Sequence, residues 1–141
     1  MSAIYLDSCI VIYLTEGPNH FREICYRALA NRKAGGAQLC FTSLTRLECR
    51  VLPMRNGQQR VLEEYDNFFS LPEARQLSIS DHVFEIATEL RAFQNLKAAD
   101  ALHLAAALHH GCTEFWTNDL RLKPAAANRL QIVNPLDPIK E

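Results

Sequence analysis

Short apolar segments alternate with segments of helical periodicity along the chain, and this alternation is the feature that most restricts its fold. Apolar runs bounded by turn residues, typical of buried strands, lie at residues 3–6, 37–42, 74–80, 113–117 and 130–134. Helical periodicity lies between and beside them, at residues 9–16, 20–33, 43–52, 58–69, 82–93 and 98–110. Alternating strands and helices predict an α/β fold with a parallel sheet and helices on both faces.

Capping and helix-breaking residues set the expected ends of these helices. N-caps are expected at Asn19, at Ser43, and at either Ser80 or Asp81, because their side-chain oxygens can accept a hydrogen bond from a free backbone N–H. Pro53 is expected to end the helix that Ser43 starts, because proline lacks the N–H that continues the backbone ladder.

The composition is that of one ordinary globular domain, taken as residues 1–141. Hydrophobic residues make up 48% of the chain and charged residues 22%, which suffices for a core without staples. No apolar run reaches the roughly 18 residues that span a bilayer. The N-terminus lacks the basic segment of a signal peptide, so a cytoplasmic protein is expected. The five cysteines include no C-x-x-C pair, which favours free thiols over a zinc site.

The segment LKAADALHLAAALHHG, residues 96–111, holds a carboxylate in an otherwise apolar helix. Nine of the eleven residues from 98 to 108 are Ala or Leu, and the exceptions are Asp100 and His103. A helix that is apolar all round is expected to be buried. A buried carboxylate is costly unless it is paired or bound to a metal, so Asp100 needs a positive partner.

Three further acids are expected near the same place. In open α/β sheets, sites form at the carboxyl ends of the strands. Asp7 directly follows the first strand, Asp119 follows the fourth, and Glu48 lies in the opening turns of the helix after the second. Asp7 also suits an N-cap, and Asp119 a turn or cap, so each has a purely structural interpretation.

Glu48 is harder to explain as a surface residue. On a helical projection it falls between Leu44 and Val51, with Leu47 nearby, which is the apolar stripe of its helix. Its carboxylate is therefore expected to point toward the core side. Asp100 likewise has no obvious solvent face.

A divalent cation would neutralise these acids. Lys97, one turn before Asp100, is the nearby cation in that helix and cannot neutralise several carboxylates. Oxygen ligands without a Cys or His cluster select a hard ion such as Mg²⁺ or Mn²⁺. Such a cluster suits phosphodiester hydrolysis. The sequence shows no recognisable Ser-His-Asp arrangement and no Gly-rich phosphate loop.

Four motifs together resemble those of the PIN-domain ribonucleases, and they are most similar to the VapC toxins of bacterial toxin–antitoxin pairs. The motifs are IYLDSCIVIYL, TSLTRLECRVLP, LKAADALHLAAALHHG and FWTNDLRL, and the resemblance runs from Ala3 to about Val133. It implies a three-layer α/β/α sandwich with a short parallel sheet and a Mg²⁺- or Mn²⁺-dependent endoribonuclease acting on structured RNA. It also implies a homodimer and a cognate antitoxin that inserts a segment into the active-site groove.

The resemblance also implies which residues act. The family's metal-binding and catalytic acids match four positions, with the first and third as central ligands: Asp7, Glu48, Asp100 and Asp119. Supporting positions match a small hydroxyl residue after the first acid and the family's TND sequence: Ser8, Thr117 and Asn118.

The net charge does not by itself indicate a nucleic-acid-binding protein. It is −1, although with four of the sixteen acids bound to metal the fifteen Lys and Arg residues would exceed the other acids by three. RNA phosphate contacts are expected from basic residues beside the acids, with a solvated surface role as the alternative for each. These residues are Arg46, Lys97 and Arg121, followed by Arg50 and Lys123.

His103 lies one turn after Asp100 and has two interpretations. It either touches the site or is a hydrogen-bonded core histidine, and the second is favoured. Trp116, at the end of a strand, is expected in the core rather than as a platform for a stacked base.

Three other functions compete with a toxin. A housekeeping RNA-processing PIN nuclease would lack a small antitoxin gene upstream. An inactive PIN-like binding module would be expected to have lost some of the acids, and all four are present. A phosphatase of the haloacid-dehalogenase type, with Asp7 as the nucleophile, needs a second Asp at the position of Cys9.

Overall fold

All five strands run parallel in one sheet, in the order β3-β2-β1-β4-β5. They are β1 (Ala3–Leu6), β2 (Gln38–Phe41), β3 (Ala74–Gln76), β4 (Glu114–Trp116) and β5 (Gln131–Val133). The computed structural model describes residues 2–137. β1 is the central strand, and its Ile4 lies opposite Leu39 on one side and Glu114 on the other. The predicted strands and the parallel sheet are confirmed.

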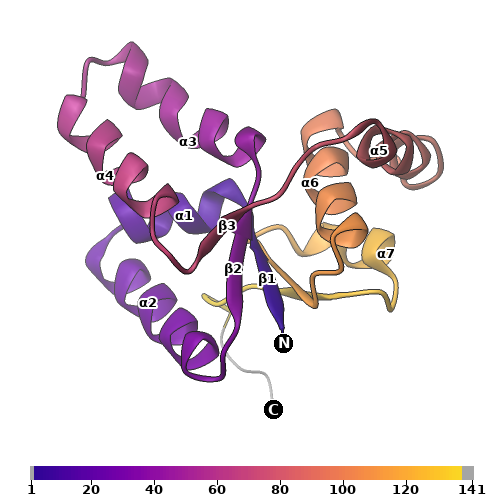
Figure 1. Cartoon of the computed structure of the whole chain (residues 1–141), viewed down its shortest axis with the longest axis horizontal. Helices are drawn as coiled ribbons and strands as arrows, with labels where there is room; N and C mark the ends of the chain where they lie inside the picture. Colours follow the sequence, from indigo (N-terminus) through magenta and orange to yellow (C-terminus); the bar gives the residue numbers. More distant parts are fainter. Residues whose placement is uncertain (1, 138–141) are drawn as a thin grey trace.

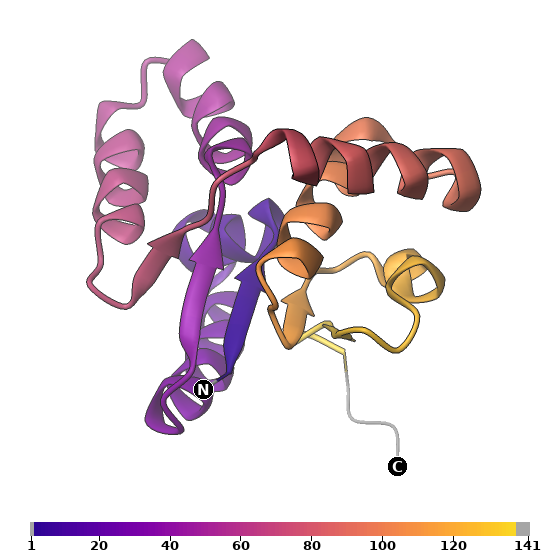
Figure 2. The same cartoon turned by 45° about the vertical axis from the view of Figure 1, so that its right-hand side comes forward.

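Helices cover both faces of this sheet, as Figure 1 and Figure 2 show. The first layer consists of α1 (Ser8–Glu16), α2 (Asn19–Ala34), α3 (Ser43–Arg55) and α4 (Gln59–Phe69). The second consists of α5 (Asp81–Gln94), α6 (Ala98–His109) and the short α7 (Lys123–Ala126), which follows the 3₁₀ turn η1 (Leu120–Leu122). The predicted α/β/α sandwich is therefore present. No helix in the described part of the chain is both long and apolar enough to cross a membrane.

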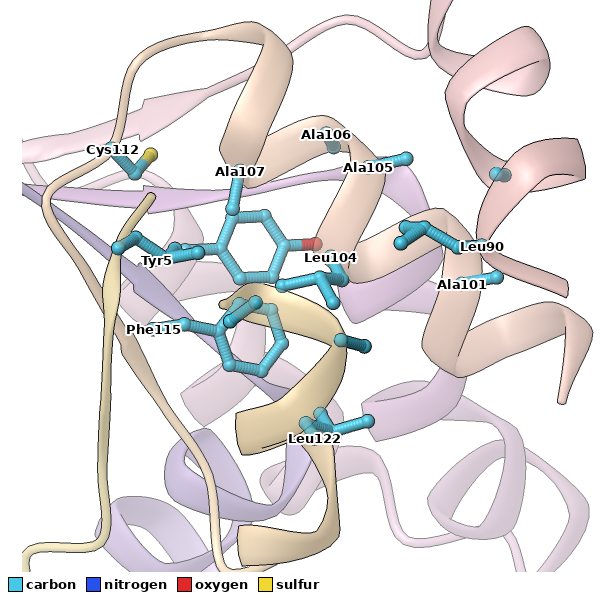
Figure 3. Packing of buried hydrophobic residues seen from close by; sticks show 14 of the residues in the cluster. Tyr5, Leu90, Ala101, Leu104, Ala105, Ala106, Ala107, Cys112, Phe115 and Leu122 are labelled. Atoms are coloured by element: carbon cyan, nitrogen blue, oxygen red, sulfur yellow. The ribbon is translucent and has the colours of Figure 1, made fainter. Parts of the chain in front are cut away.

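β1 contributes to both cores because successive strand side chains point to opposite faces. Ile4 and Leu6 pack in the core beneath α1, α2 and α4, whereas Tyr5 packs in the core beneath α5 and α6. The Tyr5 ring stacks on Phe115 with 5.1 Å between ring centroids. Figure 3 shows Leu104 of α6 beside this pair of rings. The apolar run of β1 thus matches a strand that is buried on both faces.

Two predicted N-caps of the first layer are wrong. α3 is capped by Thr42 rather than Ser43, because Thr42 and Thr45 form a reciprocal capping box, in which the Thr42 N–H donates to Thr45 Oγ1 at 3.2 Å. α2 already begins at Asn19, because the Pro18 carbonyl accepts the first helical hydrogen bond, from the N–H of Arg22. Ser80 caps α5 as predicted.

Pro53 lies inside α3 and does not end it, contrary to the prediction. Proline removes its own N–H bond, but the turn continues through the bond from Asn56 N–H to the Leu52 carbonyl. The N–H of Gln58 then donates to the Pro53 carbonyl. β3 is shorter than predicted, because residues 77–80 leave the sheet and lead into the cap of α5. The turn and short helix at residues 120–126 were not predicted.

The end of α1 depends on the absence of a side chain at Gly17. The Gly17 N–H donates to the Tyr13 carbonyl at 3.1 Å, which brings the two backbones together. A Cβ at position 17 would lie 2.5 Å from the Tyr13 carbonyl oxygen and 2.8 Å from its Cα. Since the clash is with backbone atoms, a rotamer change cannot relieve it.

We therefore expect Gly17→Ala to lower the free energy of unfolding by about 1–3 kcal/mol, measured by urea denaturation. Gly35→Ala is the matched control, because Gly35 also follows a helix but a Cβ there would lie 3.4 Å from the nearest atom, at a φ of −83°. That variant should stay within about 0.5 kcal/mol of the wild type. Equal losses in the two variants would contradict the steric explanation.

Candidate metal centre

Asp7 stands at the carboxyl end of β1 and caps α1. Its Oδ1 accepts the Ser8 N–H at 2.8 Å, and its Oδ2 accepts the hydroxyl of Thr117 at 2.8 Å. Thr117 follows β4 directly and is fully buried. Two donors from neighbouring strand ends thus hold the carboxylate in place. The capping interpretation of Asp7 is confirmed, and it is compatible with a place in the centre.

Glu48 and His103 meet Asp7 from the two layers of helices. His103 Nε2 lies 2.5 Å from Glu48 Oε1 and 3.8 Å from Asp7 Oδ1. One donor atom from each of the three residues falls within 4.8 Å of the others. Burial alone would raise the pKa of Glu48, but hydrogen bonds from His103 and Ser8 hold that pKa below its usual value.

Asp100 lies in the first turn of α6 and faces the other acids. Burial raises its pKa above the usual value, and the charges of Asp7 and Asp119 raise it further. Neighbouring carboxylates that are all ionised repel one another. Leu104, one turn on, is fully buried, so Asp100 shares the direction of the core, as predicted.

Asp119 belongs to the rim of the centre. Its carboxylate accepts a bidentate interaction from Arg121, at 2.8 and 2.7 Å, and caps η1 through the Arg121 N–H. Arg121 lowers the pKa of this carboxyl. The Asp119 N–H donates to Thr117 Oγ1 at 3.1 Å, so Thr117 connects Asp119 to Asp7.

Asn118 supports the same loop by anchoring it on α1. Its side-chain amide donates to the Tyr13 hydroxyl at 2.8 Å, and its backbone N–H faces the sulfur of Cys9 at 3.4 Å. The structure thus places Thr117 and Asn118 where they shape the loop that carries Asp119. Ser8 follows Asp7 and reaches toward Glu48.

The basic residues named for RNA contacts lie in different settings. Arg46 and Arg50 of α3 share Asp66 of α4, at 3.3 and 3.1 Å. Arg121 is held by Asp119, whereas Lys97 is exposed at the N-terminus of α6.

The predicted apolar stripe of α3 does not face the core. Leu47 is 57% exposed and Val51 is 41% exposed, and the side chains that α3 buries are Thr45, Cys49 and Pro53. Glu48 points into the centre from the border between these two faces. The stripe was misassigned because hydrophobicity alone does not show which side of a helix meets the sheet.

The sequence favoured a core position for His103 over a contact with the site, and the structure shows both. His103 is 1% exposed and hydrogen-bonded, which confirms a core histidine, and it also contacts Glu48. Its spacing of three residues from Asp100 places both on one helix face, and this was the available signal. Trp116 is in the core, as predicted.

The donor set fits a hard divalent cation. Carboxylate oxygens of Asp7 and Glu48 lie near one another, and Asp100 carries the repulsion expected beside them. Oxygen-rich sites of this kind suit Mg²⁺ or Mn²⁺. Binding a cation would relieve the repulsion that raises the pKa of Asp100.

Comparison with known families identifies the fold. A PIN domain model matches residues 4–128, which is most of the chain. The chain belongs to the PIN domain family. The match includes all four acids of the centre, at positions 7, 48, 100 and 119. No curated protein sequence matches the chain significantly.

Solved structures with the same PIN fold include toxin–antitoxin complexes and a toxin. VapBC2 from Rickettsia felis, solved with a promoter DNA fragment, gives a TM-score of 0.76 at 17% identity and covers 94% of this chain and 98% of its own. A toxin–antitoxin complex from Klebsiella pneumoniae gives 0.70 at 25% identity, covering 97% and 100%. VapC20 from Mycobacterium tuberculosis, a toxin that cleaves the sarcin-ricin loop, gives 0.72 at 16% identity, covering 88% and 95%.

Asp100→Asn should stabilise the metal-free protein, because it removes a charge that the fold disfavours. A carboxyl whose pKa is raised by folding destabilises the folded state at neutral pH. This penalty should vanish below the ordinary Asp value of 3.8, where the group is protonated in both states. We expect a rise in melting temperature on the order of 2 °C at pH 7 without metal, shrinking on acidification.

Asp81→Asn is the control, because Asp81 is an exposed Asp in the first turn of α5. Adding Mg²⁺ or Mn²⁺ should raise the melting temperature of the wild type and of this control, and much less that of Asp100→Asn. Destabilisation by Asp100→Asn in the absence of metal would make Asp100 a structural residue.

Proposed function

We propose that the protein is a Mg²⁺- or Mn²⁺-dependent endoribonuclease that acts as the toxin of a toxin–antitoxin pair in the cytoplasm. We take residues 1–141 as a single PIN domain, of which residue 1 and residues 138–141 lie outside the described part. The observation that supports the proposal is the approach of the Asp7 and Glu48 carboxylates at the carboxyl end of a PIN-family sheet, together with the charges of Asp7, Asp119 and Glu48 that raise the pKa of Asp100. Such an oxygen-rich cluster suits hydrolysis of a phosphodiester.

In this proposal, Asp7 and Asp100 are the central metal ligands, with Glu48 and Asp119 completing the site. Bound metal would supply activation of a water and stabilisation of charge on the reacting oxygens. Ser8 N–H and the Thr117 hydroxyl fix the orientation of the Asp7 carboxylate. A fixed carboxylate needs no reorganisation during the reaction, which is the advantage of such second contacts.

RNA would approach over the exposed side of the acids. Lys97 is exposed at the start of α6, beside Asp100, and Arg121 lies on the rim next to Asp119. Arg46 forms an ion pair with Asp66, and an RNA phosphate would replace the Asp66 carboxylate in this pair. These three cations offset the acids along the path of a phosphate backbone.

The toxin role is supported by the neighbours in structure, which come from complexes of a toxin with its antitoxin. We propose a cognate antitoxin as the partner that inhibits the nuclease. A small gene directly upstream that encodes such a protein separates this function from that of a housekeeping RNA-processing enzyme.

A homodimer is supported by unpartnered apolar side chains on one face of α3. Leu47 and Met54 are each 57% exposed, and Val51 is 41% exposed. A surface of this kind marks an interaction site more often than a solvent face. We propose that a second copy of the chain covers it.

Purified protein, free of any partner, should cut total cellular RNA into discrete fragments in the presence of Mg²⁺ or Mn²⁺. Chelator should abolish the cleavage, and Asp7→Asn or Asp100→Asn should lower it by at least about 100-fold. Asp81→Asn should cleave like the wild type. Fragment ends would identify the target. Cleavage that survives both substitutions would show that the activity arises elsewhere or from a contaminant.

Met54→Glu should convert the dimer to a monomer by placing a charge in the covered patch, as measured by sedimentation equilibrium. Phe84→Glu is the control, since Phe84 is a similarly exposed apolar side chain on α5. A monomeric wild type at high protein concentration would reject the dimer without affecting the nuclease proposal.

A further inference from the structure

A chain of buried polar groups runs from the base of α3 to the metal centre. The Tyr5 hydroxyl lies 3.0 Å from Thr42 Oγ1, 3.3 Å from Thr45 Oγ1 and 2.6 Å from His103 Nδ1. His103 Nε2 continues the chain to Glu48 Oε1 at 2.5 Å. The four residues behind Glu48 are at most 1% exposed. Each polar group of this chain therefore depends on its neighbours, since water does not reach it.

The Glu48 carboxylate, at the end of the chain, determines which ring nitrogen of His103 carries a hydrogen. An ionised Glu48 carboxylate accepts hydrogen bonds and cannot donate one. An approach of 2.5 Å from a bare ring nitrogen would bring two lone pairs together, so His103 Nε2 must carry the hydrogen. Asp7 Oδ1, at 3.8 Å from the same nitrogen, is too far to share it.

The same distance argues against His103 as a metal ligand. Adjacent ligands of an octahedral Mg²⁺, each about 2.0–2.1 Å from the ion, lie about 2.9 Å apart. His103 Nε2 and Glu48 Oε1 are closer than this, at the separation of a hydrogen bond. A nitrogen that carries a hydrogen has no free lone pair for a metal. The ring also lies behind the acids, at 1% exposure, whereas the Glu48 side chain is 30% exposed.

Tyr5 completes the arrangement on the other side of the ring. In a neutral ring with a hydrogen on Nε2, Nδ1 is an acceptor and the Tyr5 hydroxyl donates to it. The Tyr5 oxygen can then accept from the hydroxyls of Thr42 and Thr45. Burial raises the pKa of Tyr5 well above its usual value, so this hydroxyl keeps its hydrogen. Figure 3 shows the Tyr5 ring enclosed near Leu104 and Phe115, which fixes its direction.

We propose that His103 is a positioning residue, whose Nε2–H holds the Glu48 carboxylate beside Asp7 while the Tyr5 hydroxyl, anchored on the capping box of α3, fixes the ring. This inference rests on the proposed function, because it assigns His103 a task in the same centre. Every hydrogen of the chain then has an acceptor. The cap of α3 and the orientation of a metal-binding acid thus share one hydrogen-bond network.

The first test is the state of the His103 ring in the wild-type protein. Two-dimensional ¹⁵N–¹H NMR distinguishes a ring with a hydrogen on Nε2 from one with it on Nδ1, and Mg²⁺ is diamagnetic. We expect Nε2 to carry its hydrogen both without metal and with saturating Mg²⁺. Loss of that hydrogen on adding Mg²⁺, or a hydrogen on Nδ1 alone in either sample, overturns the proposal. This result does not depend on nuclease activity.

The second test compares His103→Gln, which keeps an N–H donor within reach of Glu48, with His103→Leu, which does not. We expect His103→Leu to raise the Mn²⁺ concentration for half-maximal cleavage about 10–100-fold and His103→Gln to restore most of it. His109→Gln, at the exposed end of the same helix, is the control. In a Glu48→Gln background, His103→Leu should cause little further loss. Full additivity of the two substitutions overturns the proposal, whereas absence of cleavage in every protein rejects the nuclease and leaves the NMR result decisive.

Discussion

The central position of β1 between β2 and β4 is the constraint on which the site depends. A parallel sheet brings the carboxyl ends of its strands to one edge, so the residues that follow β1, β2 and β4 meet there. Asp7 and Thr117 are the first residues after β1 and β4, and their side chains are already in hydrogen-bond contact. The order and direction of the strands therefore bring these positions together, whichever rotamers the side chains adopt.

Capping and function use the same residues in this protein. Asp7 caps α1 and Asp119 caps η1, yet both also belong to the acidic centre. Thr42 and Thr45 cap α3 and also contact the Tyr5 hydroxyl. A capping hydrogen bond restrains the backbone at the first turn of a helix. It therefore also restrains the positions of the side chains next to it. This explains how short loops can hold a centre of repelling charges.

The repulsion itself is a cost that the fold tolerates. Asp100 has a raised pKa, whereas Glu48 and Asp119 have lowered ones because His103 and Arg121 lie beside them. The negative charges of Glu48 and Asp119 are thus stabilised by neighbouring side chains, whereas the negative charge of Asp100 is disfavoured. A cation bound there would meet the least satisfied carboxylate, and strain of this kind is common where a site must bind a ligand tightly.

The sequence by itself determined the alternation of strands and helices, the parallel α/β class and the four acids, because these follow from local periodicity and from the positions of residues after strands. It also placed His103 on the face of Asp100.

Only the tertiary structure decided which partners these side chains take. Glu48 contacts His103, and Asp119 contacts Arg121. The apolar face of α3 lies on the solvent side of the helix and not against the sheet. These contacts join segments that are distant in sequence, such as Tyr5 and His103, which are 98 positions apart. No local pattern encodes them. The extension of α3 past Pro53 has the same origin, because packing of its buried face outweighs one missing hydrogen bond.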